Sequence, residues 1–223
     1  RQIGAWKHEN NLPIYVPERE QQLLDRLADH NPGPLDRDSL IAIYREIMSA
    51  AIKLEQPMNI AFLGPEGTFS HQAVLEKFGR GVTCQPVPTI ADVFSAVEAG
   101  RADYGMVPVE NTTEGVVNPT LDSLTEANVR IVAEFNLPVH LLLYSASPLS
   151  EIRCVYSHQQ PLGQCREYLR ANLPNATLIE VTSTTRAVEL AERERDAAAI
   201  SGKLAGDNTD LPVVAENIED NLR

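Results

Sequence analysis

The chain has 223 residues, of which 43% are hydrophobic and 22% are charged, and its formal net charge at pH 7 is −12. These values are ordinary for a globular protein that is large enough to bury a core. The negative charge argues against nucleic acid as a partner, because neutralising phosphates requires a basic surface. An anionic substrate would have to be held by a few local cations or by helix N-termini.

Neither a membrane span nor a secretion signal is indicated. No apolar run approaches the roughly 18 residues of a membrane helix, and the N-terminal stretch RQIGAWKHENN has no apolar segment. The cysteines Cys84, Cys154 and Cys165 are odd in number and lack C-x-x-C spacing, which fits a reducing compartment. We therefore expect a cytoplasmic protein that does not bind membranes.

Residues 1–56 are expected to be helical. In VPEREQQLLDRLADH, Pro17 suits a first helical turn, and Leu23, Leu24 and Leu27 form an apolar stripe. The segment NPGP at 31–34 ends this helix. A second amphipathic run, LDRDSLIAIYREIMSAAIKLEQP, stops before Pro57.

From Met58 onward, short apolar runs alternate with helical patterns, which predicts an α/β fold. The second half of the chain repeats the pattern of the first, so two α/β lobes with a cleft between them are expected. The expected strands are NIAFL, TCQPV, YGMVPV, RIVAEF, HLLLYS, RCVYS, TLIEV and AAAIS, and the expected helices are SHQAVLEKFG, IADVFSAVEAG, PTLDSLTEA, LGQCREYLRAN and TTRAVELAERER.

Three strand-to-helix junctions carry short polar side chains, and such junctions are where open α/β sheets bind ligands. In the first, AFLGPEGTFSHQAV, Gly64 and Gly67 permit a tight turn, and Thr68 and Ser70 can cap the next helix. The exposed amides of this turn could hold a carboxylate or a phosphate. A capped turn without a ligand explains the pattern equally well, and the motif lacks the G-K-[ST] ending of a nucleotide-binding loop.

The second junction is VPVENTTEGVVNPTLDSL. Asn111, Thr112 and Thr113 could cap the following helix or donate hydrogen bonds to a ligand, whereas Glu110 and Glu114 would repel an anion unless they are paired or turned away. Capping explains about half of this cluster, because one cap does not need four polar side chains.

The third junction is VYSHQQPLGQC, where Ser157 ends a strand and Gln164 follows about two helical turns later. A purely structural role is favoured here, since serine and glutamine are common near helix starts. The histidines have no i, i+4 pair, so no metal site is predicted, and His71 and His158 are interpreted as surface or capping residues. The residue pattern alone predicts a two-lobed α/β protein that binds a small anion.

The three junctions together resemble the prephenate dehydratase family. The segments GPEGTFSHQA, VPVENTTEGVVNPTLDSL and YSHQQPLGQCREYL are similar to its signature segments in order and separation, and STTRAVELA and AENIED resemble later ones. The resemblance runs from about Met58 to Arg223. Within the first 57 residues, GAWK, PERE and YREIM resemble the later part of the all-helical chorismate mutase domain, and a mutase followed by a dehydratase is the arrangement of bifunctional enzymes of phenylalanine biosynthesis.

The resemblance implies a fold of two α/β lobes like those of periplasmic binding proteins, preceded by the helices of an incomplete all-α chorismate mutase domain. The implied domains are 1–56 for the mutase part and 57–223 for the dehydratase, with lobes at about 58–136 and 137–218. The implied reaction converts prephenate to phenylpyruvate, carbon dioxide and water. Hydrogen-bond donors suffice for it, so neither a metal nor an organic cofactor is expected.

The resemblance also assigns roles in the dehydratase site. Asn111 would help to hold prephenate, and Glu110 would position its loop or take part in proton supply. Ser157 and Gln164 would contact the substrate from the second lobe. The turn Thr68, Phe69 and Ser70 would receive a carboxylate, and Thr112 and Thr113 would add hydrogen bonds.

The mutase part would rearrange chorismate to prephenate. By resemblance Lys7 and Arg19 are its cations, Glu20 binds a substrate hydroxyl, and Glu55 donates to the ether oxygen. Glu55 shares a helical face with Tyr44, Met48 and Ala51, so we expect partial burial and a raised pKa. Alternatively Glu55 frays into solvent, and Arg19 and Glu20 are surface ion partners. The family's mutase site is shared between two intertwined chains, which implies a homodimer.

Some family segments are absent from the printed sequence. It stops at Asn221-Leu222-Arg223, before the Thr-Arg-Phe segment that carries the family's catalytic threonine and before the regulatory domain that binds phenylalanine. The long first mutase helix is also missing, and GDNTDLPVV departs from the usual apolar-aromatic stretch. The chain as printed is therefore expected to be nearly inactive. The alternative is a non-catalytic protein of the same shape that binds small anions.

Overall fold

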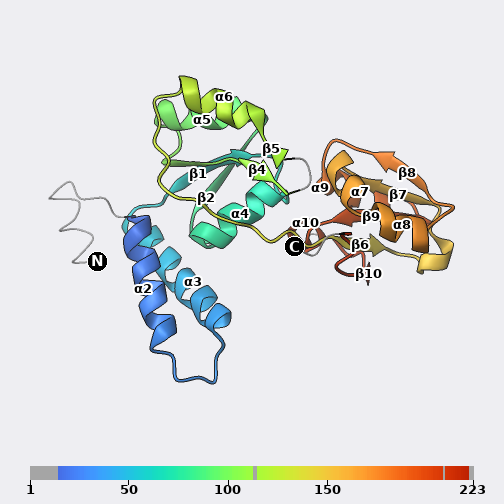
Figure 1. The fold of residues 1–223 in the computed structure, drawn as a ribbon, viewed down its shortest axis with the longest axis horizontal. Helices are drawn as coiled ribbons and strands as arrows, with labels where there is room; N and C mark the ends of the chain where they lie inside the picture. The colour runs from blue at the N-terminus through green and yellow to red at the C-terminus, as the bar shows by residue number, and fades with distance from the viewer. Residues whose placement is uncertain (1–14, 113–114, 208, 221–223) are drawn as a thin grey trace.

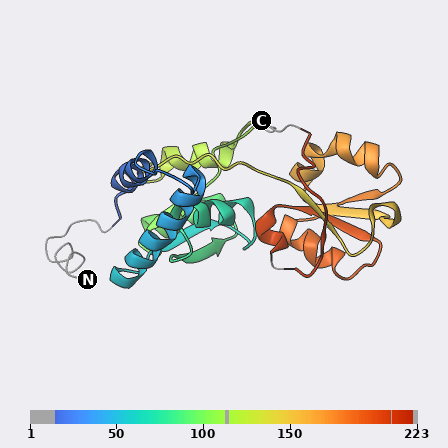
Figure 2. The same ribbon diagram turned by 90° about the horizontal axis from the view of Figure 1, so that it is seen from below.

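The computed structural model describes residues 15–112, 115–207 and 209–220. A helical pair, a first α/β lobe and a second α/β lobe follow one another along the molecule (Figure 1). A view from below shows the same order, with the helical pair and the second lobe at opposite ends (Figure 2). The α/β fold with a preceding helical segment is therefore confirmed. No helix among the described residues is both long and apolar enough to cross a membrane.

The helical pair consists of α2 (Pro17–Asp29) and α3 (Arg37–Glu55). Asp36 caps α3 by accepting a hydrogen bond from the Ser39 amide at 2.8 Å, and the helix ends at Glu55, with Gln56 as its C-cap directly before Pro57. Both predicted helices and the break at NPGP are confirmed.

The first lobe is built on a parallel sheet in the order β2-β1-β3. The apolar run NIAFL forms its central strand because both faces of that strand are covered: Ile60 and Phe62 pack with Val74 on one side, and Ala61 packs with Val93 on the other. The elements are β1 (Asn59–Leu63), α4 (Phe69–Phe78), β2 (Thr83–Val87), α5 (Ile90–Glu98), β3 (Tyr104–Met106) and α6 (Asn118–Glu126).

The second lobe has a five-stranded sheet in the order β10-β6-β9-β7-β8. Strand β9 is fully buried at its centre, with Ala198 and Ile200 in one apolar cluster and Ala197 and Ala199 in the other. The elements are β6 (Leu142–Ser145), η1 (Leu149–Glu151), β7 (Cys154–Ser157), α7 (Gln159–Gln164), α8 (Arg166–Asn172), β8 (Thr177–Glu180), α9 (Thr184–Ala191), β9 (Ala197–Ser201), α10 (Lys203–Gly206) and β10 (Val213–Ala215).

Three sequence-based expectations about secondary structure are wrong. The run RIVAEF is an extended connection and not a strand, because no described strand pairs with it, and Ile131 is 74% exposed. The run YGMVPV, expected to be one strand leading into a helix, is a strand only at Tyr104–Met106, and a hairpin of β4 (Glu110–Asn111) and β5 (Gly115–Val116) lies between it and α6. The helix expected at LGQCREYLRAN divides into α7 and α8 at Cys165, whose backbone leaves the helical conformation.

The helical pair packs against the C-terminal end of α4. The Gly81 amide donates to Ser49 Oγ at 2.8 Å, and a side chain at Gly79 would meet Ser49 Cβ at 2.6 Å. Tyr15, which precedes α2, packs its ring against Phe78 and Tyr104. The contact between α3 and the end of α4 is thus close enough to require glycine.

Candidate functional site at the junction of the two lobes

The two lobes meet where the Gly64–Ser70 turn of the first lobe rests on the second lobe. Thr185 Oγ1 at the start of α9 donates to the Glu66 carbonyl at 2.8 Å. A Cβ at Gly67 would lie 2.8 Å from Thr185 Oγ1, and one at Gly202 would lie 2.6 Å from the Phe69 ring. In this arrangement the turn itself occupies the place where the sequence predicts a cleft.

The turn is held by its own hydrogen bonds. Thr68 caps α4, because its Oγ1 accepts from the His71 amide at 3.4 Å and donates to the Pro65 carbonyl at 2.9 Å. Ser70 lies inside the helix and is not the cap. The Gly67 amide donates to His71 Nδ1 at 3.0 Å, so it is not available to an anion. The first amides of α4, those of Phe69 and Ser70, have no acceptor within the helix.

His71 is the residue of this turn whose importance the sequence does not reveal. Its ring is stacked on Phe62, with centroids 4.9 Å apart and planes 11° from parallel. Burial lowers the pKa of the imidazole, Glu66 opposes that shift, and Arg80 adds to it. Because a backbone N–H can only donate, Nδ1 must be the unprotonated nitrogen of a neutral ring. The interpretation of His71 as a surface or capping residue is wrong, because His71 is half-buried and accepts from the Gly67 amide, which lies before the cap residue Thr68.

Among the described residues, Val117 and not Asn111 or Thr112 stands at the cap position of α6, so the capping explanation is wrong for these two residues. Helix α6 begins after Val117 with Pro119 in its first turn and has no side-chain cap. Glu110 is exposed and Asn111 is half-buried in the hairpin, Thr112 is exposed, and Thr113 lies outside the described residues. Figure 1 shows this hairpin at the end of the first lobe that is turned toward the second lobe.

In the second lobe, Ser157 and Gln164 lie near the carboxyl edge of the sheet. Ser157 is fully buried and donates to the Ile200 carbonyl at 2.7 Å. Gln164 is the last residue of α7 and is half-buried. The neighbouring Ser201 ends β9, is also fully buried, and its hydroxyl has no partner among the described residues. Neither serine reaches solvent in this arrangement.

The segment AENIED fixes the position of α7 and α8, a role that its sequence does not reveal. Asp220 accepts from the amides of Glu167 at 3.0 Å and Tyr168 at 3.2 Å and so caps α8. Its own amide donates to the Gln164 carbonyl at 2.7 Å. Glu219 accepts from the Leu141 amide at 2.9 Å. Asp220 thus supplies the side-chain cap of α8 that Cys165, at the N-cap position, does not provide.

No hydrogen bond or ion pair is seen among the described residues assigned to the mutase, Arg19, Glu20 and Glu55. Glu20 faces the seam with the first lobe, where burial raises the pKa of its carboxyl and the charges of Lys77 and Arg45 lower it. Glu55 is exposed as the last residue of α3, so its expected burial is wrong, since no described element covers that helix end. Arg19 is exposed as well, and Lys7 lies outside the described residues.

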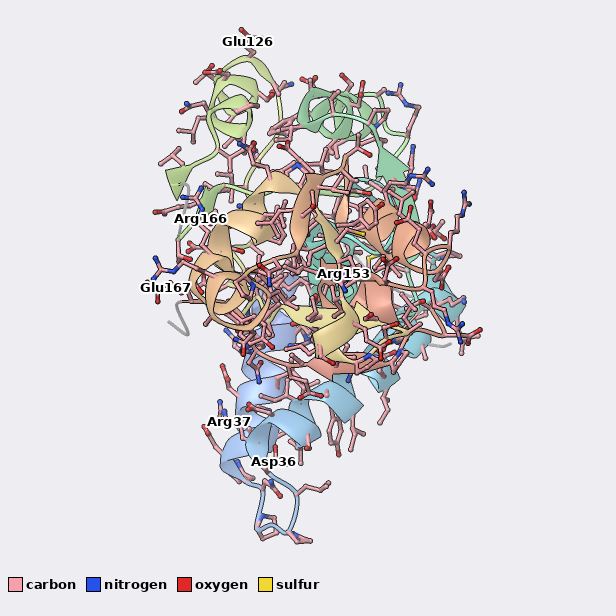
Figure 3. All side chains as sticks on the ribbon, turned by 90° about the vertical axis from the view of Figure 1, so that its right-hand side faces the viewer. Asp36, Arg37, Glu126, Arg153, Arg166 and Glu167 are labelled. Carbon is pink, nitrogen blue, oxygen red and sulfur yellow. The ribbon has the colours of Figure 1, made fainter. Side chains whose placement is uncertain are left out.

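A separate hollow of about 350 Å³ lies in the second lobe, lined in part by Ser147, Arg153 and Arg195. It is at the amino ends of β7 and β9, whereas the first lobe contacts the second near the carboxyl end of β9. Figure 3 faces this end of the molecule and labels Arg153 on it. No group of three or more His, Cys, Asp or Glu side chains in the described part of the chain could hold a metal ion.

Comparisons with known proteins support the resemblance noted in the sequence. Residues 60–223 match the family model for prephenate dehydratase, and residues 1–56 match that for chorismate mutase type II. A bifunctional chorismate mutase/prephenate dehydratase from Aquifex aeolicus is 45% identical, covering 99% of this chain and 62% of the relative.

Two solved structures are also similar. Prephenate dehydratase from Arthrobacter aurescens, in complex with L-Phe, has a TM-score of 0.66 and 34% identity over 73% of this chain and 56% of that one. The enzyme from Staphylococcus aureus has a TM-score of 0.65 and 29% identity over 74% and 62%. The chain spans about three fifths of the length of the curated relatives that it matches.

Proposed function

The chain belongs to the prephenate dehydratase family, and from that premise we propose that it forms the dehydratase core of a bifunctional enzyme that also carries chorismate mutase. The observation that carries the proposal is the contact between the Gly64–Ser70 turn of the first lobe and the second lobe near the carboxyl edge of its sheet. The proposed functional units are residues 1–56 and 57–223, with lobes at about 58–136 and 137–218.

In this proposal the substrate is the prephenate dianion. The ring carboxylate leaves as carbon dioxide, its bonding electrons enter the ring, and the ring hydroxyl departs with a proton as water, leaving phenylpyruvate. Because aromatisation favours the product, the protein has to orient the dianion and assist the hydroxyl group. The amides of Phe69 and Ser70 receive one carboxylate, and Asn111 donates to the substrate.

The remaining proposed roles fall on both lobes. Glu110 positions the hairpin or takes part in proton supply, and Thr112 and Thr113 add hydrogen bonds from the first lobe. Ser157 and Gln164 act from the second lobe. Since Ser157 is buried in this structure, substrate enters only when the lobes separate at the contact between Thr185 and Glu66. The bound state then closes around prephenate.

For the helical pair we propose a homodimer that completes a chorismate site with Lys7, Arg19, Glu20 and Glu55. The support is an apolar face that no described residue covers: Leu54 is 74% exposed and Ile47 is 56% exposed on α3. A second copy of the chain would bury this face. Analytical ultracentrifugation should show a dimer, and a monomer at all concentrations would contradict this part. A cytoplasmic location belongs to the same proposal, as an aromatic biosynthetic enzyme uses intracellular substrates.

The test is to titrate prephenate into the chain by calorimetry and to measure phenylpyruvate by absorbance, with the full-length product of the gene assayed in parallel. We expect binding by the chain and turnover by the full-length protein. An Asn111→Ala substitution should reduce dehydratase turnover by at least about tenfold and leave chorismate consumption unchanged. Binding without turnover by the full-length protein would favour the non-catalytic anion-binding alternative.

A further inference from the structure

We propose that His71 is a positioning residue of the dehydratase site: its neutral ring holds the Gly64–Ser70 turn in the form that presents the Phe69 and Ser70 amides to a substrate carboxylate, and its protonation releases the turn. This inference rests on the proposed function. It adds a pH-sensitive element to a site whose other proposed members are hydrogen-bond donors and one exposed carboxylate.

The first support is the direction of the hydrogen bond. The Gly67 amide donates to His71 Nδ1 at 3.0 Å, and Gly67 is buried under the second lobe. A buried backbone N–H needs an acceptor, and the unprotonated ring nitrogen supplies it. When Nδ1 takes up a proton, two N–H groups face each other and the bond is lost.

The second support is the fixed orientation of the ring. Stacking on Phe62 at 4.9 Å and 11° leaves Nδ1 little freedom to turn away. The His71 backbone is tied to the same turn, because its amide donates to Thr68 Oγ1. The imidazole therefore links the strand core, through Phe62, to the peptide unit directly before the cap of α4.

The charges around the ring set the pH range of the effect. Burial lowers the pKa of His71 below its ordinary value of 6.5, Glu66 on the turn raises it, and Arg80 beyond α4 lowers it. Glu66 also acts on Cys84 of β2, whose pKa is raised by burial and by that charge. Because the pKa of the ring is lowered below 6.5, the ring is neutral near pH 7 and the turn is held there; the turn is released as pH falls through that lowered pKa.

A matched pair of substitutions tests the proposal. In His71→Asn the side-chain oxygen can occupy the place of Nδ1 and accept from Gly67, whereas in His71→Gln the amide reaches the place of Nε2 instead. Prephenate binding is measured by calorimetry from about pH 7.5 to about pH 5.5, a range in which ordinary carboxyl groups stay ionised. We expect the unsubstituted chain to bind about tenfold more weakly at the acid end, as for one lost hydrogen bond.

The two variants should differ in kind. Near neutral pH, His71→Asn should bind prephenate as tightly as the unsubstituted chain does, and its affinity should not fall toward pH 5.5. His71→Gln should bind prephenate about tenfold more weakly at every pH. The proposal would be overturned if both variants bound prephenate equally at neutral pH, or if His71→Asn still lost affinity toward pH 5.5 as the unsubstituted chain does. If the unsubstituted chain fails to bind prephenate at any pH, the proposed function fails instead.

A second measurement needs neither substrate nor substitution. In nitrogen-15 NMR spectra of the chain, the Gly67 amide shift should titrate together with the His71 ring protons. The Gly100 amide lies at a turn where an added Cβ would meet nothing within 4 Å; it serves as the control and should stay constant. A Gly67 signal that does not move while the His71 ring titrates would contradict the proposed link.

Discussion

The two sides of the lobe junction differ in how their polar groups are satisfied. On the first-lobe side, the Gly67 amide, the Thr68 hydroxyl and the Glu66 carbonyl all have hydrogen-bond partners. On the second-lobe side, Ser157 is paired with a backbone carbonyl, but the buried Ser201 hydroxyl has no partner among the described residues. The polar groups of the first side are already paired, so we call that side preformed. On the second side, the Ser201 hydroxyl at the end of β9 is unpaired among the described residues.

The largest expected effect comes from the preformed side. Gly67→Ala places a side chain at φ +81° and drives its Cβ to 2.8 Å from Thr185 Oγ1. We expect a loss of about 2–3 kcal/mol of folding free energy, together with loss of prephenate binding, in thermal melts and calorimetry. Gly100→Ala is the matched control, because Gly100 has φ +67° but nothing within 4 Å. If both variants lose the same stability, the contact between the lobes contributes nothing.

The next effect concerns the segment that supports the second-lobe side. Asp220→Ala removes the cap of α8, and we expect a loss of about 1–2 kcal/mol in denaturant unfolding. Weaker prephenate binding should accompany it, because the Asp220 backbone also ties down Gln164. Glu126→Ala removes the same charge from the exposed end of α6 (Figure 3) and should change neither quantity. If the two variants had the same unfolding free energy and bound prephenate equally, Asp220 would not be the cap that supports this side.

The smallest effects sharpen the contrast between the two serines. Ser157→Ala leaves the Ile200 carbonyl without its donor and should cost about 1 kcal/mol, whereas Ser201→Ala removes an unpartnered hydroxyl and should raise stability by up to about 1 kcal/mol. Opposite shifts in the unfolding midpoint are the expected outcome. A Ser201→Ala variant that loses as much as Ser157→Ala would show that Ser201 has a partner.

The sequence predicted those elements whose pattern is local. Continuous apolar runs such as NIAFL and AAAIS are central strands, and the helix after Thr68 begins where its capping residue predicts. Periodicity and capping depend on neighbours within a few residues, so they can be read without knowing the fold.

The features that the sequence did not predict depend on partners that are distant in the chain. RIVAEF has the composition of a strand but lacks a pairing partner among the described residues. The cap of α8 is Asp220, more than fifty positions away from Glu167. His71 was visible only as a scattered histidine, because its importance comes from Phe62 and Gly67.

The position of α4 has a mechanical consequence. Its ten residues form a rod about 15 Å long, with the Thr68 turn at one end and the close contact between Ser49 and Gly81 just beyond the other. A stiff rod held at both ends cannot tilt at one without displacing the other. We therefore expect a displacement of α3 to move α4 and, with it, the Thr68 turn that contacts the second lobe, so that the helical pair and the lobe junction move together.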